Sequence, residues 1–256
     1  MVKALEGFWD KLILVSALRR WRGAMSVVDK AGPAALRRLQ RTARRERHAI
    51  DDLLHRIEGQ LSGLVRREGD RKHPAADWIW RPQVWTGPLS VPGLVVAGSG
   101  SRFSDEISVF HDCTQPEIIL HQKAVARATE ARHWALDCEV FRFDGSFLSL
   151  ALALPNDALQ GLTRRHLLQL QMALQFERPM RIYARLNIQN GPNLAQITEV
   201  VEVDGEEATV VFDLFGMSMN EKRLEKAWLD LILDVPQCNR LVVHDLVMNR
   251  YPRAEM

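Results

Sequence analysis

Cysteine is scarce in this chain of 256 residues. There are three cysteines, Cys113, Cys138 and Cys238, and they are far apart with no CxxC pair among them. This pattern excludes a zinc knuckle and a disulfide framework, because both need closely spaced or evenly paired thiols. Three free thiols in a reducing compartment are the simplest interpretation.

Long apolar runs are missing near the start of the chain. The apolar run at residues 12–15 is too short to cross a bilayer. A cleaved signal peptide needs a longer apolar centre and a cleavage site of small residues. We therefore expect a cytoplasmic protein that is not exported by a cleaved signal.

The motifs of several enzyme classes are also absent. Neither GxGxxG nor GxxxxGK[ST] occurs, so we expect no nucleotide cofactor. Carbonyl and Asp oxygens at an edge of a sandwich could hold a structural Ca²⁺, but the DxDxDG loop is absent and we name no metal ligands. The carboxylates at 105–106, 206–207, 230 and 234 have no visible partner acid, so a glycosidase is unsupported. At His111-Asp112-Cys113, an Asx-type turn at the end of a strand is favoured over a nucleophile pair. The sequence therefore predicts a protein without a catalytic site.

Charge is unevenly distributed along the chain. Residues 1–75 carry 17 Lys and Arg against 9 Asp and Glu, whereas the remaining residues carry 17 against 23. This asymmetry indicates two regions with different roles. The polar segment 69–74 (GDRKHP) ends the first region, so we predict two domains, residues 1–75 and residues 76–256.

The basic region has the periodicity of two helices. Apolar residues between 2 and 25 lie on roughly one face, and Pro33 is well placed to begin a second helix. A second apolar stripe follows: Leu36, Leu39, Ala43, Ile50, Leu53, Leu54, Ile57, Leu61 and Leu64. We expect an amphipathic helix of about thirty residues, longer than the usual globular one. It would pair with the first helix as an antiparallel hairpin or self-associate as a coiled coil.

Six arginines lie off this stripe: Arg37, Arg38, Arg41, Arg44, Arg45 and Arg47. A charge run is most often a solvated face beside a helix–helix seam. Docking on a membrane surface is a second interpretation, because Phe8, Trp9 and Trp21 with nearby cations suit an interface. Nucleic acid is not the partner that we expect, since no motif that reads DNA or RNA accompanies the cations.

After residue 75 the sequence changes to short alternating runs. Turns are indicated at Asp144-Gly145, at residues 190–193 (NGPN) and at Asp204-Gly205. Candidate strands lie near 93–97, 105–111, 116–125, 134–143, 146–154, 166–176, 180–188, 196–203, 207–214, 227–234 and 240–249. Few helix signals intervene, so we predict a mainly β fold: an antiparallel, jelly-roll-like β-sandwich preceded by an N-terminal α-helical hairpin.

Residues 167–188 are predicted to form a β-hairpin that turns at residues 177–179 (ERP). Side chains alternate faces along a strand, so one register sorts both strands. The inward residues are Leu168, Leu170, Met172, Leu174, Ile182, Ala184, Leu186 and Ile188. Burial of each apolar side chain contributes about 1.5–3 kcal/mol, against about 0.2–1 kcal/mol for an outward cross-strand pair. The inward set therefore decides the pairing.

The outward residues of this hairpin form the candidate ligand-binding surface: Gln169, Gln171, Gln175, Arg181, Tyr183, Arg185 and Asn187. Amide and guanidinium groups suit vicinal hydroxyls and an aromatic ring suits a sugar face, although such faces are often merely solvated. Trp228 and Asp230 would extend the surface, and burial of Trp228 is an equal alternative. We predict a glycan-binding protein. The alternatives are a protein-interaction or assembly scaffold that self-associates through its N-terminal helices, a protein that docks on membranes, and an enzyme whose site carries no recognised motif.

Five segments resemble a bacterial family catalogued as a domain of unknown function: FRFDGSFLSLALALP (141–155), GLTRRHLLQLQ (161–171), ARLNIQNGPN (184–193), MNEKRLEKAWLDLILD (219–234) and NRYPRAE (249–255). The resemblance covers nearly the whole chain and implies a shared architecture without an activity. The closing strand pair, AWLDLILDVP…NRLVVHDLVM, is more loosely similar to jelly-roll carbohydrate-binding modules. That second likeness is one of fold, and fold does not carry function.

Overall fold

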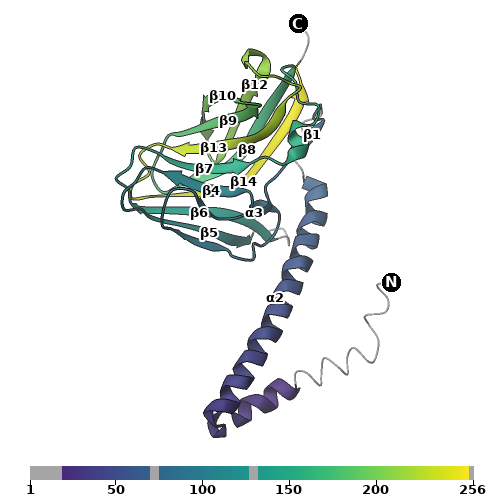
Figure 1. Ribbon diagram of the computed structural model, residues 1–256, viewed down its shortest axis with the longest axis vertical. Coiled ribbons are helices and arrows are strands. Elements are labelled where there is room, and N and C mark those ends of the chain that lie inside the picture. The colour runs from purple at the N-terminus through teal and green to yellow at the C-terminus, as the bar shows by residue number, and fades with distance from the viewer. Residues whose placement is uncertain (1–18, 70–74, 127–131, 254–256) are drawn as a thin grey trace, which may run out of the picture. The chain divides into compact units, whose positions relative to one another are not determined.

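The computed structural model describes residues 19–69, 75–126 and 132–253 (Figure 1). The chain divides into two compact units, Met1–Leu54 and His55–Met256. This division falls inside a helix, so the predicted domain boundary at residue 75 stays a prediction.

The helical part consists of residues 19–27, η2 (Val28–Lys30) and the long helix α2 (Pro33–Gly69). Pro33 begins α2 as predicted, because its fixed φ angle suits the first helical position and its missing N–H needs no partner there. The apolar stripe is exposed at Ile50 and Leu53. Residues 2–18 of the predicted first helix lie outside the described residues, so the helical hairpin and the coiled coil stay predictions. Among the described residues, no helix has the length and apolarity that crossing a membrane requires.

Two antiparallel sheets form the predicted β-sandwich. In the described part of the chain, the eight-stranded sheet has the order β11-β12-β8-β14-β6-β5-β2, with β1 also paired to β14, and the six-stranded sheet has the order β10-β9-β13-β7-β4-β3. The strands are β1 (Trp78–Trp80), β2 (Gly93–Val96), β3 (Ser101–Arg102), β4 (Ile107–His111), β5 (Glu117–Ala126), β6 (Arg132–Arg142), β7 (Leu148–Ala153), β8 (His166–Phe176), β9 (Ile182–Asn190), β10 (Asn193–Val200), β11 (Val203–Asp204), β12 (Glu207–Asp213), β13 (Leu224–Leu233) and β14 (Asn239–Pro252). Each predicted strand overlaps one of these.

Short helical turns connect some of the strands. They are α3 (Gln83–Thr86), η3 (Asn156–Leu159) and η4 (Leu214–Gly216). Two predicted turns are confirmed by tight hairpins, in which Asn190 pairs with Asn193 and Asp204 pairs with Glu207. Gly191 and Gly205 have φ angles of +62° and +64°, a backbone region that glycine enters without steric cost.

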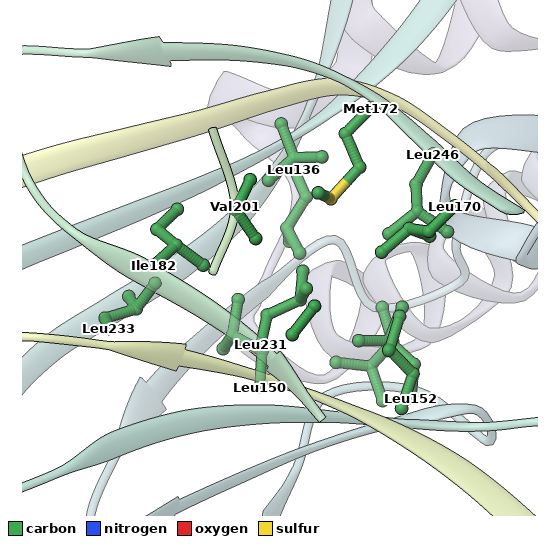
Figure 2. Close-up of a cluster of buried hydrophobic side chains, with 14 of the residues drawn as sticks. Leu136, Leu150, Leu152, Leu170, Met172, Ile182, Val201, Leu231, Leu233 and Leu246 are labelled. Carbon is green, nitrogen blue, oxygen red and sulfur yellow. The ribbon is translucent and has the colours of Figure 1, made fainter. Parts of the chain in front are cut away.

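The core lies between the two sheets. Leu150, Leu152, Leu231 and Leu233 of the six-stranded sheet pack with Leu136, Leu170, Met172 and Leu246 of the eight-stranded sheet, all of them buried (Figure 2). The eight residues predicted to face inward from residues 167–188 are also buried. The period-two alternation therefore identified the core side of both strands.

The predicted hairpin over residues 167–188 is wrong. β8 pairs with β12 and β14 in one sheet, whereas β9 pairs with β10 and β13 in the other. A hairpin in one sheet and two strands facing each other across the core bury the same apolar residues, so the alternation cannot distinguish them.

The segment between β8 and β9 crosses from one sheet to the other. Asn239 at the start of β14 holds this crossing: its Oδ1 accepts from the Arg178 backbone N–H at 2.9 Å, and its Nδ2 donates to the Arg178 carbonyl at 3.0 Å. The side chain of Asn239 is buried, so both hydrogen bonds satisfy groups that water does not reach freely. Residues 177–179 are thus a corner of the sandwich.

Candidate ligand-binding groove

A groove of about 610 Å³ lies on the outward face of the six-stranded sheet. This volume falls within the range of small-molecule binding sites. The groove is lined by side chains of β3, β4, β7, β9, β10 and β13 and of the loop before β7. It is therefore a feature of the sheet face, assembled from strands that are far apart in the sequence.

The floor of the groove is the strand β7. Its outward side chains are Ser149, Ala151 and Ala153, all small, while the intervening leucines enter the core. The neighbouring strands carry larger groups, since Phe110 on β4 pairs with Ser149 and Trp228 on β13 pairs with Ala153. Small residues flanked by large ones leave a channel along the strand. The Ser149 hydroxyl is buried in this floor and has no hydrogen-bond partner among the described residues.

Aromatic rings border the channel. Phe110 and Phe147 are 43% and 38% exposed, which is unusual for phenylalanine, and Trp228 is half-buried. The Lys226 ammonium lies 5.3 Å from the centre of the Trp228 ring, a cation–π distance. The borders of the groove thus combine apolar ring surface with positive charge.

A hydrogen-bonded network occupies the β9 and β13 side of the groove. Arg185 donates from Nε and Nη2 to Oδ2 of Asp230, at 3.0 and 2.8 Å. The amide Nδ2 of Asn187 donates to the same oxygen at 2.9 Å, and Gln196 donates to Asn187 Oδ1 at 2.7 Å. Asp230 is 5% exposed, so these donors take the place of the water that would otherwise hydrogen-bond to its carboxylate.

Further charges lie on the opposite side of the groove. Arg102 and Asp105 are exposed, and Glu106 accepts from the backbone N–H of Gln83 and from the Trp80 side chain. Burial raises the pKa of Glu106, and the two hydrogen bonds oppose that change. Both walls of the groove therefore carry charges of each sign.

Two loops clamp each other beside Phe147. Asp112 accepts from the backbone N–H groups of Ser146 and Phe147 at 2.7 and 3.1 Å, and from the Ser146 hydroxyl. Asp144 in turn accepts from the Cys113 thiol and from the backbone N–H and hydroxyl of Thr114. The hydrogen bonds from Ser146 and Phe147 lower the pKa of Asp112, and those from Cys113 and Thr114 lower the pKa of Asp144.

This clamp corrects the predicted turn at Asp112. The carboxylate bonds to residues 34 and 35 positions away instead of closing a local Asx turn. Gly145 lies at the closest approach of the loops, where a Cβ atom would meet Asp112 Oδ1 and come within 2.8 Å of the Cys113 nitrogen. The Asp144-Gly145 turn predicted from the sequence is therefore also a packing contact that fixes the position of Phe147.

The seven residues predicted to bind a ligand do not form one surface. Gln169, Gln171 and Gln175 belong to β8 and face outward from the eight-stranded sheet, where Gln175 contacts His244. Arg181, Tyr183, Arg185 and Asn187 belong to β9 or immediately precede it, in the six-stranded sheet. The prediction of a single surface depended on the hairpin and fails with it.

Arg185 and Asn187 do line the groove, together with Trp228 and Asp230, the two residues proposed to extend the surface. Tyr183 faces the same side of β9 but lies outside the groove lining, and its hydroxyl is 3.5 Å from Arg181 Nη1. Phe110, Phe147 and the floor residues were not among the predicted site residues. The alternation Leu-Ser-Leu-Ala-Leu-Ala at 148–153 was the signal for a floor, because it places only small residues on the outward face.

The whole chain, residues 1–256, matches the model of a family of unknown function, DUF6478. The chain belongs to this family. The predicted resemblance is thereby confirmed, and the family brings no activity with it. No curated protein matches the chain.

Several solved structures are similar to part of this member of DUF6478. The family 11 carbohydrate-binding module from Clostridium thermocellum, in complex with a mixed-linked tetrasaccharide, is 8% identical, with a TM-score of 0.37 over 66% of this chain and 100% of that one. The xylan-binding CBM22-1 domain of Xyn10C from Paenibacillus barcinonensis is 7% identical, with a TM-score of 0.37 over 62% of this chain and 100% of that one.

The bacteriophage CBA120 tailspike protein 4 domain is 8% identical, with a TM-score of 0.39 over 61% of this chain. The chain spans 21% of that domain and 25% of the next two structures, a xylanase and an exo-β-agarase. At this level of similarity none of these structures assigns a ligand to this chain.

Proposed function

We propose that the groove on the six-stranded sheet binds a carbohydrate chain. The observation that carries the proposal is the groove itself: a channel floored by Ser149, Ala151 and Ala153 between exposed aromatic rings on one side and a guanidinium–carboxylate–amide network on the other. Sugars present both kinds of surface, since their C–H groups are apolar and their hydroxyls donate and accept hydrogen bonds.

The network retains bonding capacity for hydroxyl groups. Within the described residues, every hydrogen bond to the Asp230 carboxylate goes to Oδ2, and the Arg185 guanidinium donates from Nε and Nη2 but not from Nη1. An acceptor, Asp230 Oδ1, therefore lies near a donor, Arg185 Nη1. A vicinal diol matches this pair, with one hydroxyl donating to the carboxylate and the other accepting from the guanidinium.

The aromatic border supplies the apolar contact. Phe110 and Phe147 keep more than a third of their surface exposed, although burial of a phenylalanine side chain stabilises a fold by about 1.5–3 kcal/mol. Exposed rings beside a groove are typical of a binding surface. A pyranose ring stacked on one of them would remove that apolar area from water.

The direction of the groove favours an extended ligand. Ser149, Ala151 and Ala153 lie in line along β7, and their outward faces span about 13 Å at about 3.3 Å per residue. A channel with this floor accommodates consecutive sugar units. We therefore infer an oligosaccharide or polysaccharide segment as the ligand, in place of a single sugar.

Affinity electrophoresis through gels that contain soluble polysaccharides, followed by calorimetry with oligosaccharides, tests this proposal. We expect retardation in at least one polysaccharide, and a loss of affinity of at least about tenfold for Phe110→Ala, because stacked aromatic contacts contribute on the scale of 1 kcal/mol beyond their buried area. Phe215→Ala is the matched control, since Phe215 is also exposed but lies outside the groove lining. Failure to bind any glycan in the gels and on a glycan array, or equal losses for the two variants, would refute the proposal.

A further inference from the structure

The segment from Arg19 to Ile50 has a strong charge of one sign. It contains ten Lys and Arg but only two acidic residues, Asp29 and Glu46. It belongs to the helical unit, and none of its residues lines the groove. Such an excess attracts polyanions over distances comparable to the Debye length, about 8 Å at physiological ionic strength.

The arginines of α2 gather on one helix face. With 3.6 residues per turn, Arg37, Arg41 and Arg44 lie within about 60° of one another, and Arg38 and Arg45 widen the face to about 120°. All five are exposed. Leu36, Leu39 and Ala43 occupy the opposite face and are partly buried. The cationic face of α2 is therefore turned toward solvent.

Exposed apolar side chains lie next to these cations. Met25, Val27 and Val28, at the end of the first described helix and in η2, are 69%, 55% and 41% exposed. They follow Arg22 and precede Lys30. Large apolar side chains that cluster in an exposed turn between cations are typical of a surface that meets another apolar phase.

We propose that residues 19–50 dock on a lipid bilayer surface that carries anionic headgroups. The arginine face meets the negative surface potential of the bilayer, and Met25, Val27 and Val28 enter the boundary between headgroups and acyl chains. A nucleic acid would use the arginines but would leave the three apolar side chains in water. A second copy of the chain fits less well, because Glu46 lies in the apolar stripe between Ala43 and Ile50 that would form the seam.

Vesicle sedimentation with the full-length protein tests this proposal. We expect binding to vesicles of phosphatidylglycerol and phosphatidylcholine, no binding to pure phosphatidylcholine, and weaker binding at high salt. The variant Arg37→Gln/Arg41→Gln/Arg44→Gln retains helix-forming residues. It should bind about fivefold more weakly for each arginine removed, or about a hundredfold in all.

Control variants distinguish the loss of a contact within residues 19–50 from a change in the total charge or hydrophobicity of the protein. Arg142→Gln/Arg178→Gln/Arg223→Gln removes the same charge from exposed positions of the sandwich and should weaken binding by less than about threefold, because these residues lie outside the docking segment. Val27→Ser/Val28→Ser should weaken binding by at least about tenfold, since two apolar side chains no longer enter the boundary. The control Val91→Ser/Val95→Ser, at exposed positions of the sandwich, should leave binding unchanged.

Three outcomes would overturn the proposal. They are equal binding to charged and uncharged vesicles, equal losses for the two arginine triples, and binding to a double-stranded DNA fragment that is sensitive to the arginine triple but not to the valine pair. Circular dichroism of each variant confirms that α2 is intact. The outcome is independent of the groove, because no residue of this segment lines it.

Discussion

Replacing Arg185 tests the energetic account of the groove most directly. Asp230 is 5% exposed and accepts two hydrogen bonds from Arg185 and one from Asn187. In Arg185→Met the carboxylate keeps only the amide donor. Removing one partner of a fully buried ion pair costs about 3–5 kcal/mol, but the Arg185 side chain is 37% exposed, so water replaces part of what is lost. We therefore expect a loss of about 2 kcal/mol in the free energy of unfolding.

The reciprocal change should cost less. In Asp230→Leu the guanidinium can turn toward solvent, and Asn187 Nδ2 keeps the carbonyl oxygens of Arg185 and Trp228 as acceptors. We expect a loss of about 1 kcal/mol for this variant. Leucine has the same number of side-chain heavy atoms as aspartate and the same branching. The double variant Arg185→Met/Asp230→Leu therefore replaces the ion pair by apolar groups and should be no less stable than Arg185→Met alone.

Urea denaturation of the four proteins, followed by tryptophan fluorescence, measures this cycle. Five of the seven tryptophans lie in residues 76–256, so the signal reports on the sandwich. The expected coupling energy is at least about 1 kcal/mol, well above the additivity error of about 0.3–0.5 kcal/mol for independent sites. Additive losses, or a larger loss for Asp230→Leu than for Arg185→Met, would show that the carboxylate does not depend on the guanidinium.

Three further predictions concern the clamp and the thiols. Gly145→Ala should destabilise the protein by about 1–3 kcal/mol in urea titration, because its Cβ atom would overlap Asp112 and approach the Cys113 nitrogen; a neutral effect would contradict the observed loop packing. The pKa values of Asp112 and Asp144 are lowered in the folded state, so the two ionised carboxylates stabilise the fold fully above their usual pKa of 3.8, and this contribution is lost as the pH falls through the folded-state pKa. In Asp112→Asn the free energy of unfolding should therefore depend less steeply on pH in the acid range, and an unchanged dependence would show that the Asp112 carboxylate does not stabilise the fold. Burial raises the pKa of the Cys138 thiol to about 12. Iodoacetamide at pH 8, with mass spectrometry as the readout, should therefore label the exposed Cys238 well before Cys138, and equal labelling rates would contradict the burial of Cys138.

Local patterns were sufficient for much of the architecture. The strands, the Gly191 and Gly205 turns and the start of α2 at Pro33 each depend on residues that are close in sequence, so short-range rules predict them. The pairing of β8 with β14 joins residues more than sixty positions apart. No local pattern specifies such a partner, and the hairpin prediction failed for this reason.

The candidate groove was predicted only in part for the same reason. Arg185, Asn187, Trp228 and Asp230 were singled out by their side-chain chemistry, and they meet because β9 and β13 are neighbours. Phe110 comes from β4, two strands beyond β13, and Phe147 is brought to the border by a clamp between two loops. Their chemistry is unremarkable in the sequence, and they become candidates only when the sheet places them beside a floor of small residues.

The order of residues along each strand was enough to assign one side to the core and the other to the exterior, because alternation is a property of a single extended segment. Which strands contribute their outward side chains to the same surface depends on how the strands are arranged in the two sheets. β8 and β9 carry similar amide and guanidinium side chains, but they lie in different layers, so Gln169 and Arg185 face away from each other on opposite sides of the sandwich. Burial of their apolar faces stabilises both strands in the sandwich. The sheet to which each strand belongs is decided by pairing with strands that are distant in sequence, which no local pattern specifies.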